Sequence, residues 1–224
     1  DVSSLGIGNS GSASSSTLTT ARIGVIGTSD IATTDIKING KDWTATAFDV
    51  SEAIVTPAYS ATQDVSGALA ANSLQATAIA VKINENTGEH GVTARAYNEI
   101  TTTNSSYVAA DTIINAVTVQ SRGTQAEFVA AINEEIAGVT AAIGTDGKVT
   151  LSNNTGKSIN LGTGSVSTLG LAVDIYGGFV ELSSADGSDI AIESGSKING
   201  YVSTTANTAQ LGVLGLNEVS SVND

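Results

Sequence analysis

The residue best suited to acid–base chemistry at neutral pH is the one histidine of the chain, His90. A hydrolase triad would have to use it, but the chain contains no Gly-x-Ser-x-Gly turn for a nucleophile. A zinc protease helix needs two histidines and is therefore excluded. Because His90 lies in a polar stretch after a predicted helix, we interpret it as a solvated turn residue without a catalytic role.

Two glycine patterns resemble phosphate-binding loops. Residues 6–11 match the dinucleotide-binding pattern letter by letter, but a run of serines follows where the mechanism needs a helix N-terminus. Gly156-Lys157-Ser158 resembles the end of a phosphate-binding loop, but Leu151 stands where the first glycine should be. We interpret the second pattern as a hairpin turn, and we expect no nucleotide or other cofactor.

Acidic residues and cysteines give no metal or catalytic pattern either. Asp146, Asp186 and Asp189 lie near predicted turns, where isolated aspartates usually bond their own backbone. Glu134-Glu135 belongs to a predicted helix surface, and no calcium-loop spacing occurs. The absence of cysteine excludes disulfides, thiolate metal sites and a thiol nucleophile. The sequence therefore predicts no catalytic, cofactor-binding or metal-binding residues, and we expect that the protein is not an enzyme.

Two segments fit the acceptor pattern for N-linked sugars, Asn104-Ser105-Ser106 and Asn153-Asn154-Thr155. Such matches are common by chance in a chain rich in Ser and Thr, and exposed Ser and Thr could equally carry O-linked sugars. The sequence leaves both kinds of modification open.

Charge and hydropathy limit the possible partners. The chain has 224 residues, of which 9 are basic and 22 acidic, so its formal charge is −13. Nucleic acid and anionic membranes need a clustered basic surface, and we expect neither as a partner. No apolar stretch approaches the ~20 residues of a membrane-spanning helix, and no signal peptide is evident. Methionine is absent even at position 1, which indicates a fragment or a processed product.

The N-terminal part is predicted to lead from a flexible segment into a hairpin. Residues 1–20 are rich in Ser, Thr and Gly, which favours an extended or flexible lead-in. Residues 23–26 fit a short strand. Ile36 and Ile38 alternate with polar residues, and Asn39-Gly40 after them is a strong hairpin signal.

A first helix is predicted upstream of residue 88. Five apolar residues have helical spacing: Leu74, Ala78, Ile79, Val81 and Ile83. Asn72 and Gln75 resemble a capping pair, and Thr87-Gly88 is expected to end the helix. Further upstream, Trp43 and Phe48 are predicted core residues.

A second helix and its hairpin have clearer signals. Thr124 and Glu127 have the spacing of a capping box. Apolar residues then recur at every fourth position: Phe128, Ile132 and Ile136. Gly138 is expected to stop the helix, and Asp146-Gly147 should join strands at residues 139–143 and 149–151. Ile159 and Leu161 indicate another strand.

A last hairpin is predicted to join residues 180–182 to residues 190–192 through Asp186-Gly187. Aromatic residues are only 4% of the chain, so the core must be built from Val, Ile, Leu and Ala. We predict an α+β fold with two strand–helix–strand repeat units, antiparallel hairpins and an elongated, two-lobed shape.

The two predicted helices belong to an internal repeat, a helix ending in Ile-Asn followed by a Gly-Val-Thr-Ala strand. The second copy contains Ala131-Ile132-Asn133, Gly138-Val139-Thr140-Ala141 and a turn from Asp146 to Leu151. It resembles the "IN" motif of bacterial flagellins. The first copy, Ala78 to Arg95, departs from the motif because it has Lys82 before Ile83-Asn84 and lacks the Asp-Gly-Lys hairpin.

The resemblance implies the outer, variable region of a flagellin, because the sustained heptads of flagellin ends are missing. Residues 1–34 would then be a lead-in from the filament core, and residues 35–105 a first IN-like unit opened by a strand at Ile36 to Gly40. Residues 106–175 would form a second IN-like unit, and residues 176–224 a closing hairpin and return segment. The two termini should lie close together at the base.

Two main functional hypotheses follow. The first is a structural domain on the exterior of an extracellular flagellar filament, in contact with other flagellin subunits and exposed to antibodies or glycosylation. The alternative is a surface adhesin or glycan-binding module for host surface glycans, with Trp43 or tyrosines stacking on sugar. The same motif also occurs in filament-cap and hook-associated proteins, so a fragment of one of these remains open. An enzyme grafted onto the outer domain is the least supported hypothesis.

Overall fold

The computed structural model describes residues 16–23, 30–49, 54–55, 73–74, 76–104, 106–195, 197–198, 201–202, 214 and 216. These residues form short helices and mostly antiparallel sheets, which confirms the α+β class in its broad form. The elements are β1 (Thr17–Thr19), β2 (Ile36–Ile38), β3 (Lys41–Asp42), β4 (Ile54–Val55), β5 (Ser73–Leu74), α2 (Ala76–Asn84), α3 (Thr87–His90), β6 (Val92–Thr101), β7 (Thr112–Ile114), β8 (Val117–Val119), α4 (Gln125–Glu135), β9 (Thr140–Ile143), β10 (Val149–Asn153), β11 (Ile159–Leu161), α5 (Ser165–Leu169), β12 (Asp174–Tyr176), β13 (Phe179–Ser184), β14 (Ile192–Ser194), β15 (Lys197–Ile198) and β16 (Tyr201–Val202).

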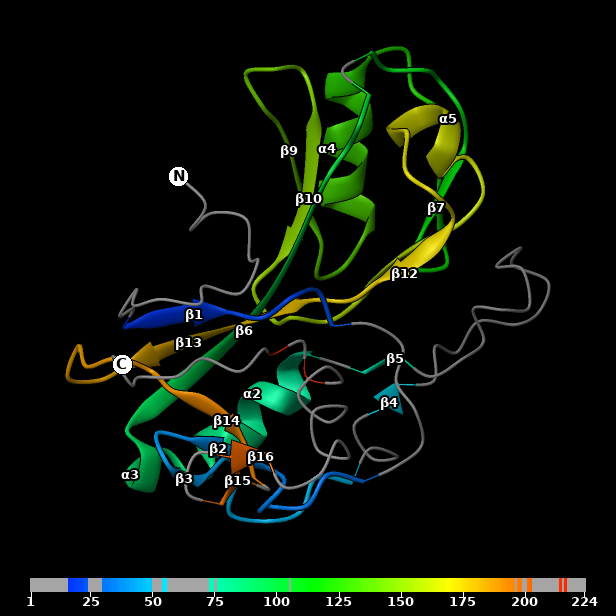
Figure 1. Ribbon diagram of the computed structural model, residues 1–224. Coiled ribbons are helices and arrows are strands. Elements are labelled where there is room, and N and C mark those ends of the chain that lie inside the picture. Colours follow the sequence, from blue (N-terminus) through cyan, green and yellow to red (C-terminus); the bar gives the residue numbers. More distant parts are fainter. Residues whose placement is uncertain are drawn as a thin grey trace.

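Two hydrophobic cores lie side by side in the described part of the chain. We call the body around the first core lobe 1; its core residues come from residues 23–96 and 180–216. Lobe 2 surrounds the second core, whose residues all come from residues 100–171. Figure 1 shows lobe 2, with α4 and α5, above lobe 1, with α2 and α3.

Strand β6 belongs to both lobes. Its first six residues pair with β13, from Val92 opposite Ser184 to Tyr97 opposite Phe179. Its last four residues pair with β10 instead, beginning with Asn98 opposite Asn153. The sheet order β1-β13-β6-β10-β9 therefore runs from one lobe into the other, and β6 changes partner between residues 97 and 98.

Helix α2 covers β6 and β13 in lobe 1. Its buried residues are Ala76, Ile79, Ala80 and Ile83. Val81, another of the apolar residues with helical spacing, is 55% exposed. Val81 lies two residues from both Ile79 and Ile83, which places it on the opposite side of a helix with 3.6 residues per turn. Leu74 lies in β5 rather than in the helix.

The predicted end of this helix is also corrected. Helix α2 ends at Asn84, and Thr87-Gly88 begins the separate short helix α3. Gly91, with φ of 73°, ends α3, because a left-handed residue stops a helix and lets the chain turn away. The Thr87 hydroxyl donates a hydrogen bond to the Val92 carbonyl and ties the start of α3 to the start of β6.

In lobe 2 the predicted helix and hairpin are confirmed. Thr124 accepts a hydrogen bond from the Glu127 backbone while the Glu127 carboxylate accepts one from the Thr124 backbone, so the capping box is complete. Gly138 has φ of 75°, just beyond the helix. Strands β9 and β10 pair through a turn in which Gly147 has φ of 79°.

Two tight hairpins have the same two-residue turn. Asn39 and Gly40 have φ of 51° and 73°, as a type I′ turn requires, and they join β2 to β3 as predicted. Asn115 and Ala116 have φ of 49° and 67° and join β7 to β8. This second turn was not predicted, because Ala116 stands where such turns usually have glycine.

The predicted last hairpin is wrong. Strand β13 pairs with β1 and β6, whereas β14 pairs with β2. The Asp186-Gly187 turn is present, but the chain then crosses to another sheet because Ile190 and Ile192 complete the core of lobe 1. Residues 17–19 form an edge strand paired with β13, which agrees with the extended alternative for this part of the lead-in.

Gly156-Lys157-Ser158 does not form the predicted hairpin turn. Strand β10 pairs with β6 and β9, while β11 pairs with β7 and β12, so the segment connects two different sheets. Gly156 has φ of 71°, and a Cβ there would lie 2.5 Å from the Cβ of Ala96. The glycine is therefore needed for close backbone packing against β6.

Several predictions fall outside the described residues: the glycine pattern at residues 6–11, most of the strand at residues 23–26, the capping pair Asn72 and Gln75, and most of the tail from residue 201. The four-part division of the chain stays a prediction.

Candidate functional site

His90 is not the solvated turn residue that the sequence suggested. It is only 3% exposed and lies at the end of α3, beneath the β2–β3 turn. Its Nε2 is 3.1 Å from the Ile83 carbonyl, and its Nδ1 accepts a hydrogen bond from the Val92 backbone. This pattern fits a neutral ring with its proton on Nε2. Burial lowers the pKa of His90, while hydrogen bonds to the carbonyls of Ile83 and Trp43 partly oppose this effect.

His90 therefore has a structural role. Both ring nitrogens are occupied by backbone groups, which leaves neither free for a substrate. The carbonyl of His90 accepts a hydrogen bond from the side chain of Asn39, 2.8 Å away. The residue thus ties α2, β6 and the β2–β3 turn together.

The asparagine of each Ile-Asn pair makes the same contact in both lobes. Asn84 donates from Nδ2 to the Ala94 carbonyl (2.9 Å), and its Oδ1 accepts from the Ala94 backbone (2.8 Å). Asn133 makes the same two hydrogen bonds with Ala141, at 3.0 and 2.7 Å. Each side-chain amide thus pairs with a strand backbone as a neighbouring strand would. The Ile-Asn pairs are evident in the sequence, but the role of their asparagines was not predicted.

The asparagines of the two hairpin turns form a second matching pair. Asn39 donates from its backbone to the Ala191 carbonyl (2.9 Å), and its side chain accepts from the Ala191 backbone (2.8 Å). Asn115 forms the equivalent pair of bonds with Asn160, both at 2.9 Å. Each turn therefore holds a third segment against its hairpin. Sequence alone could not identify these partners, which lie far along the chain.

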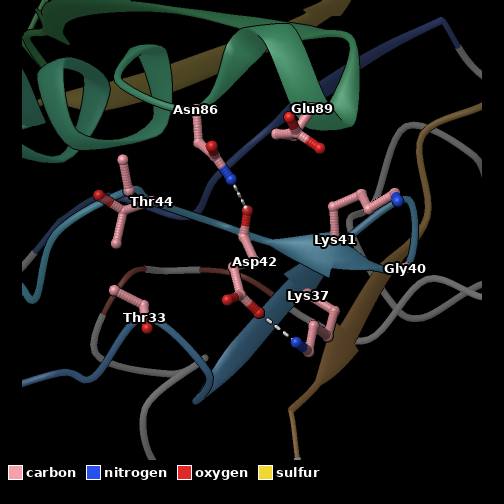
Figure 2. Close-up of a pocket in the computed structure, with 9 residues that line it drawn as sticks. Thr33, Lys37, Gly40, Lys41, Asp42, Thr44, Asn86 and Glu89 are labelled. Carbon is pink, nitrogen blue, oxygen red and sulfur yellow. Dashed lines mark hydrogen bonds and ion pairs between the residues drawn. The ribbon is translucent and has the colours of Figure 1, made fainter.

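A polar hollow of about 460 Å³ opens beside β3 and α3. Figure 2 shows the Asn86 side chain pointing from the helical side toward β3, where it donates to the Asp42 carbonyl at 2.7 Å. Below it, Lys37 and Asp42 form an ion pair across the β2–β3 hairpin. The other lining residues are Thr33, Gly40, Lys41, Thr44, Ala45 and Glu89.

The Thr44 hydroxyl and the Glu85 carboxylate, beside this hollow, form hydrogen bonds and an ion pair with neighbouring groups. Thr44 donates toward the Thr46 carbonyl (3.1 Å) and Glu85 (3.2 Å), and Lys82 forms an ion pair with Glu85 at 3.0 Å. Burial raises the pKa of Glu85, but hydrogen bonds from Lys82, Thr46 and Thr44 outweigh it and lower the pKa overall.

Two of the aromatic residues proposed to stack on sugars, Trp43 and Tyr97, pack against other aromatic rings. Trp43 is fully buried, donates from Nε1 to the Ala32 carbonyl (3.0 Å) and packs edge-on against Phe48. Its prediction as a core residue, with Phe48, is confirmed. Tyr97 stacks on Phe179 with ring centres 5.4 Å apart. Trp43 is therefore not available to a glycan, which removes the main residue cited for the adhesin alternative.

The turn aspartates and the described sugar-acceptor pattern have local roles. Asp146 accepts from the Lys148 backbone (3.1 Å), and Asp186 accepts from the backbone of Ser188 (2.9 Å). Hydrogen bonds from Ser188 and Ser184 lower the pKa of Asp186. In the acceptor pattern, Asn153 donates from its side-chain amide to the Lys157 carbonyl (2.8 Å). That nitrogen is the atom to which a sugar would be attached.

Across the described ranges, His and acidic side chains form no group of three that could hold a metal ion. No helix in the same part of the chain is long and apolar enough to cross a bilayer.

No protein-family model matches this chain, and no curated protein matches it.

Proposed function

We propose that this chain is the outer region of a flagellin-type filament subunit, exposed on the filament exterior and without catalytic activity. The observation that carries the proposal is the repeated asparagine contact. Asn84 and Asn133 each follow an isoleucine at a helix end, and each pairs through its side chain with the alanine of Gly-Val-Thr-Ala. The two segments that resemble the flagellin IN motif thus share a hydrogen-bonding interaction as well as a sequence pattern.

We further propose that the chain contains two copies of one unit, with the second inserted into the first. Each unit has a hairpin with an asparagine turn, an Ile-Asn helix, two antiparallel strands and a strand that returns to the hairpin. In lobe 1 these are β2–β3, α2, β6, β13 and β14. In lobe 2 they are β7–β8, α4, β9, β10 and β11. Apart from the second half of β6, lobe 2 lies between β6 and β13 in the sequence, so the units are nested rather than consecutive.

The routing of the chain supports an attachment through lobe 1. Ile23 from the first described segment and Leu214 and Leu216 from the last all belong to the core of lobe 1. A body whose first and last described segments both join one core can be attached to a larger assembly through that core, as inserted domains commonly are. Lobe 2 would then be the outermost part, and a charge of −13 would keep the crowded exterior soluble.

The proposal is tested by immunogold electron microscopy of the source cells with antibodies raised against this 224-residue chain. We expect gold along the whole length of the flagellar filament. Gold confined to the filament tip or to the hook junction would move the assignment to a cap or hook-associated protein. Gold on the cell body with unlabelled filaments would contradict the flagellar proposal and favour a surface adhesin.

A further inference from the structure

The two lobes are joined by two covalent crossings. One is strand β6, at the step from Tyr97 to Asn98 where it changes partner. The other is Gly177-Gly178, between β12 of lobe 2 and β13 of lobe 1. The first crossing is part of a continuous strand, and lobe 2 also touches lobe 1 where Gly156 packs against Ala96 and Ala76 and where the Thr77 hydroxyl donates to the Thr155 carbonyl. A Gly-Gly step has wide backbone freedom, so the second crossing by itself would not fix the angle between the lobes.

A third segment passes over this joint without being part of either crossing. We call residues 17–23 the strap. Its β1 portion pairs with β13, and beyond it Thr20 donates to the Val180 carbonyl (2.9 Å) and accepts from the Val180 backbone (3.0 Å). The Ile23 backbone then donates to Gly178 at 2.8 Å. A Cβ on Gly177 would lie 1.7 Å from the Ile23 carbonyl oxygen, so the strap rests directly on the glycine step.

Arg22 of the strap contacts both crossings at once. One guanidinium nitrogen donates to the Asn98 side chain (2.9 Å) and to the Gly177 carbonyl (2.5 Å), and the other donates to the Glu99 carbonyl (2.7 Å). The guanidinium carbon also lies 4.6 Å from the ring centre of Phe179 and 5.7 Å from that of Tyr176. A planar group with several donors and a cation–π face can hold such a junction in one geometry.

Asn98 extends this network into lobe 2. It is 1% exposed, and its Nδ2 donates to the carbonyls of Lys157 (2.9 Å) and Tyr176 (2.8 Å) while its Oδ1 accepts from Arg22. Every polar atom of this buried amide is therefore used at the joint. Loss of Arg22 would leave the Asn98 oxygen and the Gly177 carbonyl without that donor.

We propose that the strap, through Arg22, fixes the angle between the two lobes, so that releasing the strap lets them hinge at the Gly177-Gly178 step. This inference holds whether or not the protein is a filament subunit.

The test measures the distance distribution between the lobes by pulsed electron paramagnetic resonance. The chain contains no cysteine, so spin labels can be attached at two introduced sites alone, V81C in α2 and I143C in β9. Both parent side chains are exposed. We expect one narrow distance peak in the labelled parent protein. In Arg22→Ala we expect a broad distance distribution instead.

Two further variants keep the test decisive. Arg122→Ala is the matched control, because Arg122 forms an ion pair with Glu135 (2.7 Å) inside lobe 2, and its peak should stay narrow. Arg22→Lys keeps the charge but loses the forked geometry, and should broaden the peak even if Arg22→Ala fails to fold. A narrow distance peak in a folded Arg22 variant would overturn the proposal. So would a distance distribution in the parent protein as broad as that of the variants. Circular dichroism and Trp43 fluorescence establish that each variant is folded.

Discussion

Asparagine is the residue type that organises this protein. Four asparagines, Asn39, Asn84, Asn115 and Asn133, each pair with the backbone of a segment outside their own turn or helix. An amide carries both a donor and an acceptor on one planar group, so it can replace a strand partner at a helix end or a turn. Asn84 and Asn133 use both side-chain atoms in this pairing, and aspartate would lack their donor, whereas at Asn39 and Asn115 the backbone donates and the side chain only accepts.

The burial of His90 predicts a pH dependence of folding. Its pKa is lowered in the folded protein below the ordinary value of 6.5. Stability from the neutral ring is therefore fully present above about pH 6.5 and declines as the pH falls toward the lower folded-state pKa, because the unfolded state then binds the proton more readily. Protonation would also remove the acceptor for the Val92 backbone.

The measurement is urea unfolding at pH 7.5 and 5.5, followed by the fluorescence of Trp43, the only tryptophan and a core residue of lobe 1. We expect a lower midpoint at pH 5.5 than at pH 7.5. In His90→Gln, whose side chain does not titrate, this difference should shrink. An equal difference in the variant and the parent would assign the pH effect to other groups.

At the level of elements, the two asparagine hairpins differ in one informative residue. The second turn position is Gly40 in lobe 1, with φ of 73°, and Ala116 in lobe 2, with φ of 67°. A left-handed conformation is unfavourable for alanine because its Cβ crowds the following carbonyl. The β7–β8 turn therefore contains local strain at its second position that the β2–β3 turn lacks.

We predict that Ala116→Gly stabilises lobe 2. The relief of ~1–2 kcal/mol is partly offset by the larger unfolded-state entropy of glycine, ~0.4–1 kcal/mol, so the expected net gain is about 0.5–1 kcal/mol. Far-UV circular dichroism during urea unfolding measures the change. The reciprocal variant Gly40→Ala should be destabilising, since nothing lies within 4 Å of a Cβ there and only backbone strain would act. Destabilisation by both substitutions would contradict this account.

At the level of the whole molecule, one core is built from a single continuous segment of the chain and the other from two separate segments. All core residues of lobe 2 come from residues 100–171, whereas those of lobe 1 come from both sides of this segment. A contiguous segment with its own core meets the usual conditions for a domain that folds alone. Lobe 1, by contrast, has to bring distant parts of the chain together.

We predict that a fragment of residues 98–176 folds by itself. It keeps the second half of β6, the strands from β7 to β12, and helices α4 and α5. Well-dispersed amide signals in an NMR spectrum and a cooperative thermal transition would support the prediction. Phe128→Ala in the same fragment removes a fully buried ring and should unfold it, because such substitutions cost about 3–5 kcal/mol. Poorly dispersed amide signals from the fragment would show that lobe 2 needs lobe 1 in order to fold.

Local chemistry in the sequence determined several parts of the fold. The capping box at Thr124 and Glu127, the Asn39-Gly40 turn, the β9–β10 hairpin and the burial of Trp43 and Phe48 were predicted and are confirmed. Each depends on residues close in sequence or on strong hydrophobicity. The signals are readable because their energies come from nearby backbone groups or from removing a large apolar surface from water.

Only the tertiary structure decided how distant segments pair. The burial of His90, the return of β14 to β2 rather than to β13, and the strap across the joint all involve partners more than fifty residues apart. Turn signals such as Asp186-Gly187 show where a chain bends but not which strand it joins afterwards. Strand choice depends on which pairing completes a core, and that free energy belongs to the assembled molecule rather than to any local segment.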